Sequence, residues 1–384
     1  MLPEVLSNDL CSLKPNEDKL TFSTVFELTS AGEVVERWFG RTIIHSNKRF
    51  TYENAQQSLD AQGEFHKELA ILNSLAKKIL AARFKAGAIS FEQDEVKFEL
   101  NETGAPIRVF RKVRTDSHKL VEEFMLLANR EVATYVSKLL KSRKDRGFFV
   151  YRIHDHPNQD KITALGIFLK AIGYELKIEK GKVGTRDLNA LFKQIEGEAE
   201  EGIIKTAAIR SMAKAIYSTK NIGHYGLGFD YYTHFTSPIR RYADVLVHRL
   251  LDHYLKGEIV AERDVAFYEN MSARVTDREI LAAEAERDSI KLKQVEYMSR
   301  FIGKSFKGTI SGVTQWGLYI EETETKCEGL VKMRDIGDDY FMLDSKNYRI
   351  RGEKSKKTFA LGDAVNFKVV SADTERKSLD YALI

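Results

Sequence analysis

The chain has 384 residues, with 60 lysines and arginines against 56 aspartates and glutamates, for a formal net charge of +4. Because the two signs nearly balance, any nucleic-acid-binding surface must come from local clustering of basic residues. No apolar run reaches the roughly 18 residues of a membrane span and no signal peptide is present, so we expect a cytoplasmic protein. Cys11 and Cys327 fit no metal-binding spacing and are expected to be reduced.

Two β-hairpins and two helices are predicted in the first 106 residues. Residues 20–28 and 33–44, rich in β-branched and aromatic residues, form the first hairpin. Helices follow near 52–59 and over 64–85. The second helix has an apolar stripe of Leu69, Leu72, Ala76, Ile79 and Leu80. A second hairpin alternates Val96, Phe98 and Leu100 before a turn at 101–106.

A long helix is predicted over residues 117–141, capped by Asp116 or Ser117. Its expected buried side consists of Leu120, Phe124, Leu127, Ala128, Val132 and Val136. Glu122 and Glu123 interrupt this side, and an acidic pair near a helix start is typical of a solvated face that the helix dipole favours.

A short buried strand at 147–153 leads into His154, Asp155 and His156. A His-x-His pair is compatible with a metal site, but no third ligand follows at a known spacing. We therefore expect hydrogen-bonded loop residues. Helices are predicted near 160–172, 185–195 and 202–217.

Residues 224–251 concentrate histidines, aromatics and paired arginines in one short stretch. Thr236, Ser237 and Pro238 predict the start of a helix over 239–255, with Val245, Leu246, Leu250 and Leu251 facing a core. Arg240 and Arg241 would then lie in the first turn, where the helix dipole disfavours cations. Either a bound phosphate offsets this penalty, or one arginine pairs with Asp244 or another carboxylate.

A largely helical segment over 262–301 precedes a boundary at residues 303–305. The remaining residues form short alternating strands, which favours an OB-type barrel. The sequence thus predicts an α+β protein, with residues 1–302 as one domain and residues 303–384 as a small all-β domain.

Several ordered sequence blocks resemble the RNB family of 3′→5′ exoribonucleases, which includes ribonuclease II and ribonuclease R. The blocks are MLPEVLSNDLCSL at the start, AISFEQDEVKF at 88–98, HKLVEEFMLLAN at 118–129, YRIHDHP at 151–157, GHYGLG at 223–228, HFTSPIRRYAD at 234–244 and AERD at 285–288. From about Phe306 the chain resembles the family's S1 RNA-binding domain.

The resemblance implies a family member without its front portion, which carries cold-shock-type domains and the aspartate cluster that binds magnesium. An internal start codon, a split gene or a fragment would each explain this. No equivalent run of closely spaced aspartates is found here. Asp338 and Asp339 are expected to lie in a solvated loop.

The resemblance also implies roles for individual residues. Arg240 would bind the scissile phosphate, supported by Arg241 and Tyr242, and Glu286 matches a glutamate near the active site. Phe91 would stack on bases, although a hydrophobic plug fits equally well locally, and Glu122 would contact the ribose. Further expected RNA-binding residues are His234, Ser237, Phe306, Lys307, Trp316, Tyr319, Lys332 and Arg334. Trp316 and Tyr319 are expected to be the more exposed aromatics.

The first functional hypothesis is a monomeric exoribonuclease that hydrolyses single-stranded RNA to nucleoside 5′-monophosphates with two magnesium ions. An RNA-degradation complex or the ribosome are further candidate partners. The second hypothesis is an inactive RNA-binding remnant, because the metal-binding aspartates are missing. A third is a first domain that fails to fold and exposes sheet edges.

Overall fold

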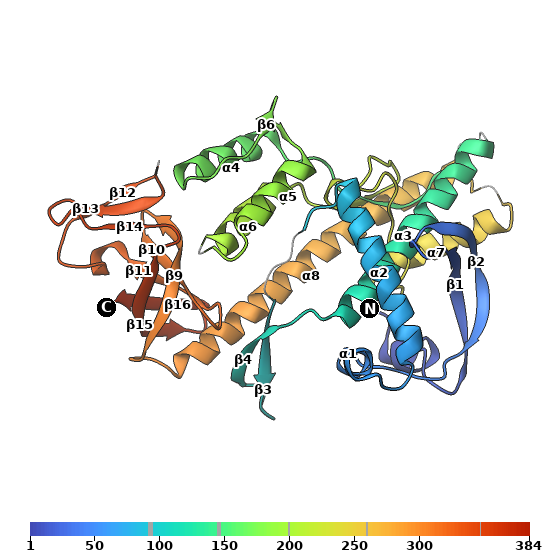
Figure 1. The fold of residues 1–384 in the computed structure, drawn as a ribbon, viewed down its shortest axis with the longest axis horizontal. Coiled ribbons are helices and arrows are strands. Elements are labelled where there is room, and N and C mark those ends of the chain that lie inside the picture. Colours follow the sequence, from blue (N-terminus) through green and yellow to red (C-terminus); the bar gives the residue numbers. More distant parts are fainter. Residues whose placement is uncertain (91–94, 144–146, 199, 259, 346) are drawn as a thin grey trace. The chain divides into compact units, whose positions relative to one another are not determined.

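The computed structural model describes residues 1–90, 95–143, 147–198, 200–258, 260–345 and 347–384. The chain forms two compact units, each assembled from separate segments. The first contains Met1–Ile89, Arg114–Asp155 and Ala213–Glu279, and the second contains Ser90–Val113, His156–Met212 and Ile280–Ile384. The mixture of helices and strands confirms the α+β class (Figure 1). The domain boundary near residue 303 stays a prediction.

The first unit combines one long hairpin with several helices. Its elements are β1 (Asp18–Leu28), β2 (Val34–His45), α1 (Tyr52–Ala61), α2 (His66–Ala86), α3 (Asp116–Arg143), β5 (Tyr151–Ile153), β8 (Ile216–Ser218), α7 (Tyr242–Leu255) and the start of α8 (Val265–Ser299). A π-helical turn at Val5–Leu10 precedes β1. Strands β1 and β2 pair antiparallel from Asp18↔His45 to Leu28↔Val34, which confirms the first predicted hairpin.

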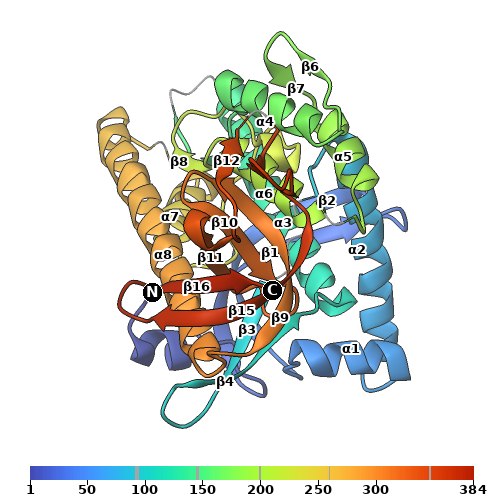
Figure 2. The same ribbon diagram turned by 90° about the vertical axis from the view of Figure 1, so that its left-hand side faces the viewer.

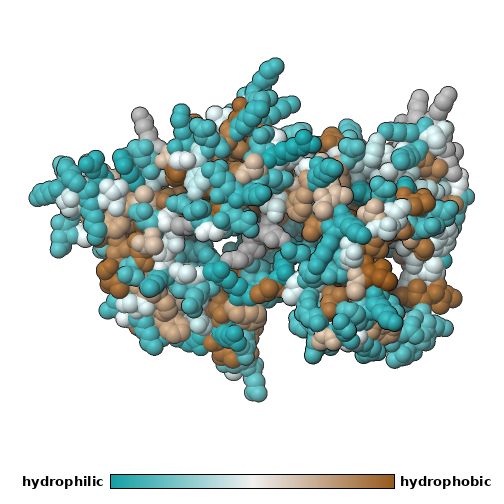
Figure 3. All heavy atoms as spheres, viewed as in Figure 1, coloured by the Kyte–Doolittle hydropathy of each residue, from teal (hydrophilic) through white to brown (hydrophobic). Residues whose placement is uncertain are grey.

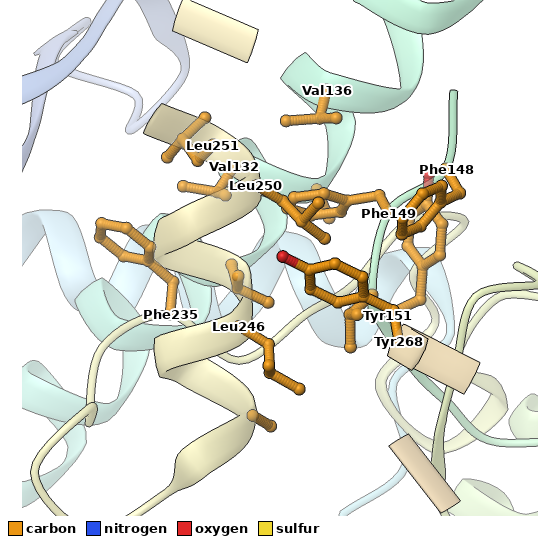
Figure 4. Packing of buried hydrophobic residues seen from close by; sticks show 14 of the residues in the cluster. Val132, Val136, Phe148, Phe149, Tyr151, Phe235, Leu246, Leu250, Leu251 and Tyr268 are labelled. Carbon is orange, nitrogen blue, oxygen red and sulfur yellow. The ribbon is translucent and has the colours of Figure 1, made fainter. Parts of the chain in front are cut away.

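The core of the first unit forms where α3 and α7 pack on the segment that leads into β5 (Figure 4). Val132 and Val136 of α3 belong to this core together with Leu246 and Leu250 of α7, and all four are fully buried. Helical spacing of these residues predicted the two faces correctly. Truncating any one of them to alanine would cost about 2–5 kcal/mol for the leucines and somewhat less for the valines.

Two predictions about helices were wrong. The helix expected over 202–217 ends at Ser211, and Ile216–Ser218 instead forms β8, which pairs with β5. Tyr217 is buried in this strand, and its amide donates to Thr276 Oγ1 of α8 at 3.0 Å. On α2, Leu72 is exposed, so only Ala76 and Ile79 of the predicted stripe are fully covered.

The second unit contains a hairpin, three helices and a closed barrel. The hairpin consists of β3 (Glu95–Leu100) and β4 (Pro106–Lys112), and the helices are α4 (Gln159–Ala171), α5 (Thr185–Gln194) and α6 (Glu201–Ser211). The small pair β6 (Ile178–Glu179) and β7 (Lys182–Val183) separates α4 from α5. The second predicted hairpin and the helices at α4 and α5 are confirmed.

The barrel confirms the predicted OB-type domain (Figure 2). Its strands, in barrel order, are β10 (Gly317–Glu322), β11 (Glu328–Lys332), β16 (Ser378–Leu383), β15 (Ala364–Asp373) and β9 (Ser305–Thr314). Alternate side chains such as Leu318, Ile320 and Phe367 point inward and are fully buried.

A three-stranded sheet accompanies the barrel and was only partly predicted. It contains β12 (Phe341–Asp344), β13 (Arg349–Gly352) and β14 (Thr358–Ala360). From the sequence, only the segment NYRIRG at 347–352, which contains β13, is predicted to be a strand, so β12 and β14 were missed. No described helix is both long and apolar enough to span a bilayer.

Candidate functional site

The turn before α7 holds the paired arginines, and it differs from the predicted helix start. The carbonyl of Ser237 accepts hydrogen bonds from the amides of Arg240 at 3.3 Å and Arg241 at 3.0 Å, so residues 237–241 form a tight turn. Pro238 fits this turn because its fixed φ suits the second position. Helix α7 begins at Tyr242, and Arg241 is its extended N-cap residue. The prediction that both arginines lie in the first helical turn was therefore wrong.

Asp244 explains why the helix begins there. Its carboxylate is completely buried and accepts the amide of Ser237 at 2.7 Å. It also accepts two parallel bonds from Arg241, from Nε to Oδ2 at 2.9 Å and from Nη2 to Oδ1 at 2.8 Å. The predicted alternative of an internal arginine–Asp244 pair is thus correct for Arg241, which is a positioning residue in this geometry.

Arg240 is different from its neighbour. It is exposed, and among the residues that the structure describes no carboxylate forms an ion pair with it. Tyr242, which follows, is also exposed. The turn therefore presents one guanidinium to solvent, while the adjacent guanidinium holds the backbone in place. A free guanidinium fork beside a fixed turn suits the oxygens of a phosphate.

His234 lies behind the turn in a hydrogen-bonded aromatic cluster. Its Nδ1 is 2.7 Å from the hydroxyl of Tyr217. Burial, followed by the charges of Arg241 and Arg152, lowers the pKa of His234 to about 2. Burial also raises the pKa of the Tyr217 hydroxyl. The histidine is therefore a neutral hydrogen-bonding group near pH 7 rather than a third cation.

Two further polar groups in this cluster were missed by sequence reasoning. Arg152 of β5 binds Glu279 of α8 with two bonds of 2.5 and 2.9 Å, and its guanidinium lies 4.6 Å from the ring centre of Tyr217. Asn129 of α3 accepts the amide of Phe235 at 2.8 Å. These partners lie far apart in sequence and carry no local spacing signal. Only the tertiary fold brings them together.

The His154 region confirms the expectation of hydrogen-bonded loop residues. His154 Nδ1 accepts the amide of Gly226 at 3.0 Å, so Nε2 carries the proton and donates to the carbonyl of Ala213 at 2.9 Å. Burial, then the adjacent His154, lowers the pKa of His224 to about 3. Within the described ranges, no group of three or more histidine, cysteine, aspartate or glutamate side chains could hold a metal ion. The side chains that the structure describes therefore do not fit a magnesium site.

The two glutamates of α3 have different environments. Glu123 is buried and bound by Arg83 of α2 through two bonds of 3.2 and 2.5 Å, so the expectation of a solvated acidic pair was wrong for this residue. Glu122 is half-buried and pairs with Arg114. Its predicted contact with ribose stays a prediction.

Two other residues predicted from the family resemblance are Glu286 and Phe91. Glu286 is exposed on the part of α8 that belongs to the second unit, and no described cation pairs with it. Phe91 lies outside the described residues. The roles of both residues stay predictions.

The predicted RNA-binding residues of the barrel lie in several environments. Trp316 is 65% exposed, as expected, whereas Tyr319 is half-buried on the outer face of β10, over Gly312. Lys307 and Arg334 are exposed, and Lys332 pairs with Asp380 at 2.7 Å. The ring of Phe306 packs against Phe301 and Phe367, which favours a role in the barrel core.

Comparison with known proteins assigns both parts of the chain. Residues 1–257 match the RNB domain and residues 299–383 match the S1 RNA-binding domain. The fold and the sequence thus define a nuclease-type domain followed by an RNA-binding barrel. The chain belongs to the RNB family.

Within the RNB family, the chain is similar to ribonuclease R of several bacteria. The chain is similar to ribonuclease R of Aquifex aeolicus, with 34% identity over 100% of this chain and 55% of that protein. It is 33% identical to ribonuclease R of Escherichia coli over 100% of this chain and 48% of that protein. The chain therefore spans about half the length of these relatives.

Solved structures agree with the assignment. Mycoplasma genitalium RNase R in complex with ribose-methylated single-stranded RNA superposes with a TM-score of 0.89 and 27% identity, covering 100% of this chain and 60% of that one. Yeast Ssd1, described as a pseudonuclease, has a TM-score of 0.69 at 19% identity, covering 96% of this chain and 44% of that one. The second likeness concerns the fold alone.

Proposed function

We propose that this chain is the RNA-binding and phosphate-binding part of a ribonuclease R-like exoribonuclease. The whole protein would hydrolyse single-stranded RNA from its 3′ end and release nucleoside 5′-monophosphates in the cytoplasm. The observation that carries the proposal is the turn at 237–241, where Arg241 is locked to Asp244 while Arg240 stays exposed without an ion-pair partner among the described residues. Similarity to ribonuclease R along the whole chain supports it.

In this proposal Arg240 binds the scissile phosphate and stabilises the charge that develops in the transition state. Arg241 and Tyr242 support it, Phe91 stacks on bases, and Glu122 contacts the ribose. Magnesium would supply metal-assisted hydrolysis in the whole protein. Its ligands would come from polypeptide that corresponds to the upstream half of the relatives, since the described residues hold no metal-binding group.

The surface of the first unit supports the need for further polypeptide. Leu20 and Ile43 are cross-strand partners on the β1–β2 hairpin, yet they are 85% and 69% exposed. Val5 and Leu10 of the preceding turn are also exposed, and apolar side chains reach the surface over the hairpin in Figure 3. Among the described residues, the β1–β2 sheet contains two strands, and no further strand pairs with either of its outer edges.

A second candidate function is an RNA-binding protein without catalysis, which the lack of a metal-binding group among the described residues favours. One assay separates the two. Labelled single-stranded RNA is incubated with magnesium and the chain, with and without a co-expressed upstream half of a ribonuclease R relative. Monophosphate release that requires the upstream half supports the nuclease, whereas binding without release under both conditions supports the second candidate.

A further inference from the structure

The β12–β14 sheet of the second unit has one buried face and one open face. Phe341, Ile350 and Phe359 point into the barrel-domain core. The cross-strand partners Met342 and Arg351 lie on the opposite face and are exposed. This open face is separate from β10, which carries Tyr319, and from the β9–β10 turn, which carries Trp316.

The hairpin between β13 and β14 is held in one shape by Asp339. Its carboxylate accepts the amides of Tyr340 and Ser355 at 2.7 Å each and the Ser355 hydroxyl at 2.5 Å. These bonds, led by the one from the Ser355 hydroxyl, hold the pKa of Asp339 well below its usual range. A Cβ at Gly352 would lie 2.4 Å from Asp339 Oδ2, so the arrangement requires glycine at this position. A loop that is already ordered loses little entropy on binding.

The ordered loop displays cations. Arg351, Lys354 and Lys356 are exposed, and no carboxylate in the described part of the chain pairs with them. By contrast, Arg349 on the same strand is neutralised by Asp344 at 2.9 Å. Residues 351–357 contain four basic side chains and one acidic side chain, that of Glu353. In Figure 3 hydrophilic side chains cover the surface over the β12–β14 sheet.

An aromatic side chain lies beside these cations. Tyr340 is 67% exposed, and its carbonyl accepts the amide of Glu353 at 2.9 Å, so its backbone continues the pairing of β12 with β13. Exposed aromatics next to unpaired cations are typical of surfaces that stack single-stranded bases and track their phosphates. An acidic protein would satisfy the cations but would not require the aromatic ring.

We propose that Tyr340, Met342, Arg351, Lys354 and Lys356 form a second contact surface for single-stranded RNA. This inference rests on the proposed function, because it identifies a further binding surface for the same substrate. The lysines would contact phosphates and Tyr340 would stack on a base. RNA would thus bind to the β12–β14 sheet as well as to the barrel strands.

The test measures binding of the whole 384-residue chain to a fluorescent single-stranded oligouridylate of about 16 nucleotides, the upper range for an OB fold, without magnesium. A Lys354→Gln/Lys356→Gln variant should weaken binding about five- to tenfold. It should also reduce the slope of log affinity against log salt by about 1.4, since each phosphate contact on a single strand contributes about 0.7. Tyr340→Ala should weaken binding by a similar factor with an unchanged salt slope.

The matched control is Lys170→Gln/Lys193→Gln, which removes the same charge from exposed positions on α4 and α5 of the same unit. It should leave affinity and salt slope unchanged, and thermal unfolding should show that all variants remain folded. If the parent binds and the Lys354/Lys356 variant behaves like this control, the inference is wrong while the proposed function stands. A parent that binds no RNA overturns both. Equal competition by polyglutamate would assign the surface to acidic protein and also overturn the inference.

Discussion

Arg241 and Asp244 form a two-bond ion pair that closes the turn before α7, with N–O distances of 2.9 and 2.8 Å. Because Asp244 also accepts the amide of Ser237, one buried carboxylate holds both ends of the segment that contains Arg240. The two consecutive arginines consequently have different roles. Arg241 stabilises the conformation of the turn, and the side chain of Arg240 extends from the turn into solvent.

Asp244→Ala should destabilise the first unit by about 3–5 kcal/mol, because it leaves the Arg241 guanidinium without its buried partner. Urea unfolding measures this. Asp252, whose pair with Arg41 at 2.8 Å is largely exposed on the arginine side, provides the control, and Asp252→Ala should cost less than about 1 kcal/mol. Equal losses for the two variants would show that the buried pair does not hold the turn.

Arg240→Ala should leave the unfolding free energy within about 0.5 kcal/mol of the parent, since the side chain is exposed. When the chain is co-expressed with the upstream half of a ribonuclease R relative, Arg240→Ala should lower the rate of RNA hydrolysis about 10²–10³-fold. This is the usual effect of removing one group that stabilises transition-state charge. Arg240→Lys should recover only part of the rate, because lysine lacks the planar fork. A hydrolysis rate near that of the parent would remove Arg240 from catalysis.

Acid should destabilise the first unit through its buried histidines. Burial lowers the pKa of His224 to about 3 and of His234 to about 2, and it also lowers the pKa of His248. Below about pH 6.5 the unfolded chain takes up protons that the folded chain does not, so stability falls as pH falls. The slope should approach about 1.4 kcal/mol per pH unit for each histidine, with no contribution from them above neutral pH.

Urea unfolding between pH 7 and pH 5 measures this slope. His234→Gln should reduce it by about one histidine's contribution. A variant with the parent's slope would show that His234 is protonated in the folded state.

Gly317→Ala should severely destabilise the barrel. Gly317 has φ = +140°, and a Cβ there would lie 1.9 Å from the carbonyl oxygen of Val331. Strain and overlap together should cost more than about 3 kcal/mol. Gly104 also has positive φ, but a Cβ there would meet no described atom within 4 Å, so Gly104→Ala should cost only about 1 kcal/mol in thermal unfolding. Similar losses at both glycines would contradict the close approach of β10 to β11.

Leu20→Ser/Ile43→Ser should reduce self-association of the isolated chain, because it removes two exposed apolar side chains from neighbouring strands. It should also weaken co-purification with the upstream half of a relative. Sedimentation velocity measures the first effect and affinity pull-down the second. Ile71→Ser on the exposed face of α2 is the control and should leave pull-down unchanged. Unaltered association of the double variant would mean that another surface is used.

The sequence by itself determined the elements with a strong repeating pattern. Helices α2 and α3, both predicted hairpins and the five barrel strands follow from periodic apolar residues and turn residues, because these signals are local. The block HFTSPIRRYAD likewise identified the functional turn from adjacent residues.

Only the tertiary structure decided which charges are free. Ser-Pro suits either a helix start or a tight turn, and the buried carboxylate of Asp244 selects the turn. Glu122 and Glu123 are adjacent in sequence, yet only Glu123 is buried, where it forms an ion pair with Arg83 of another helix. Such pairings join residues far apart in the chain, so their electrostatic consequence exists only once the fold has formed.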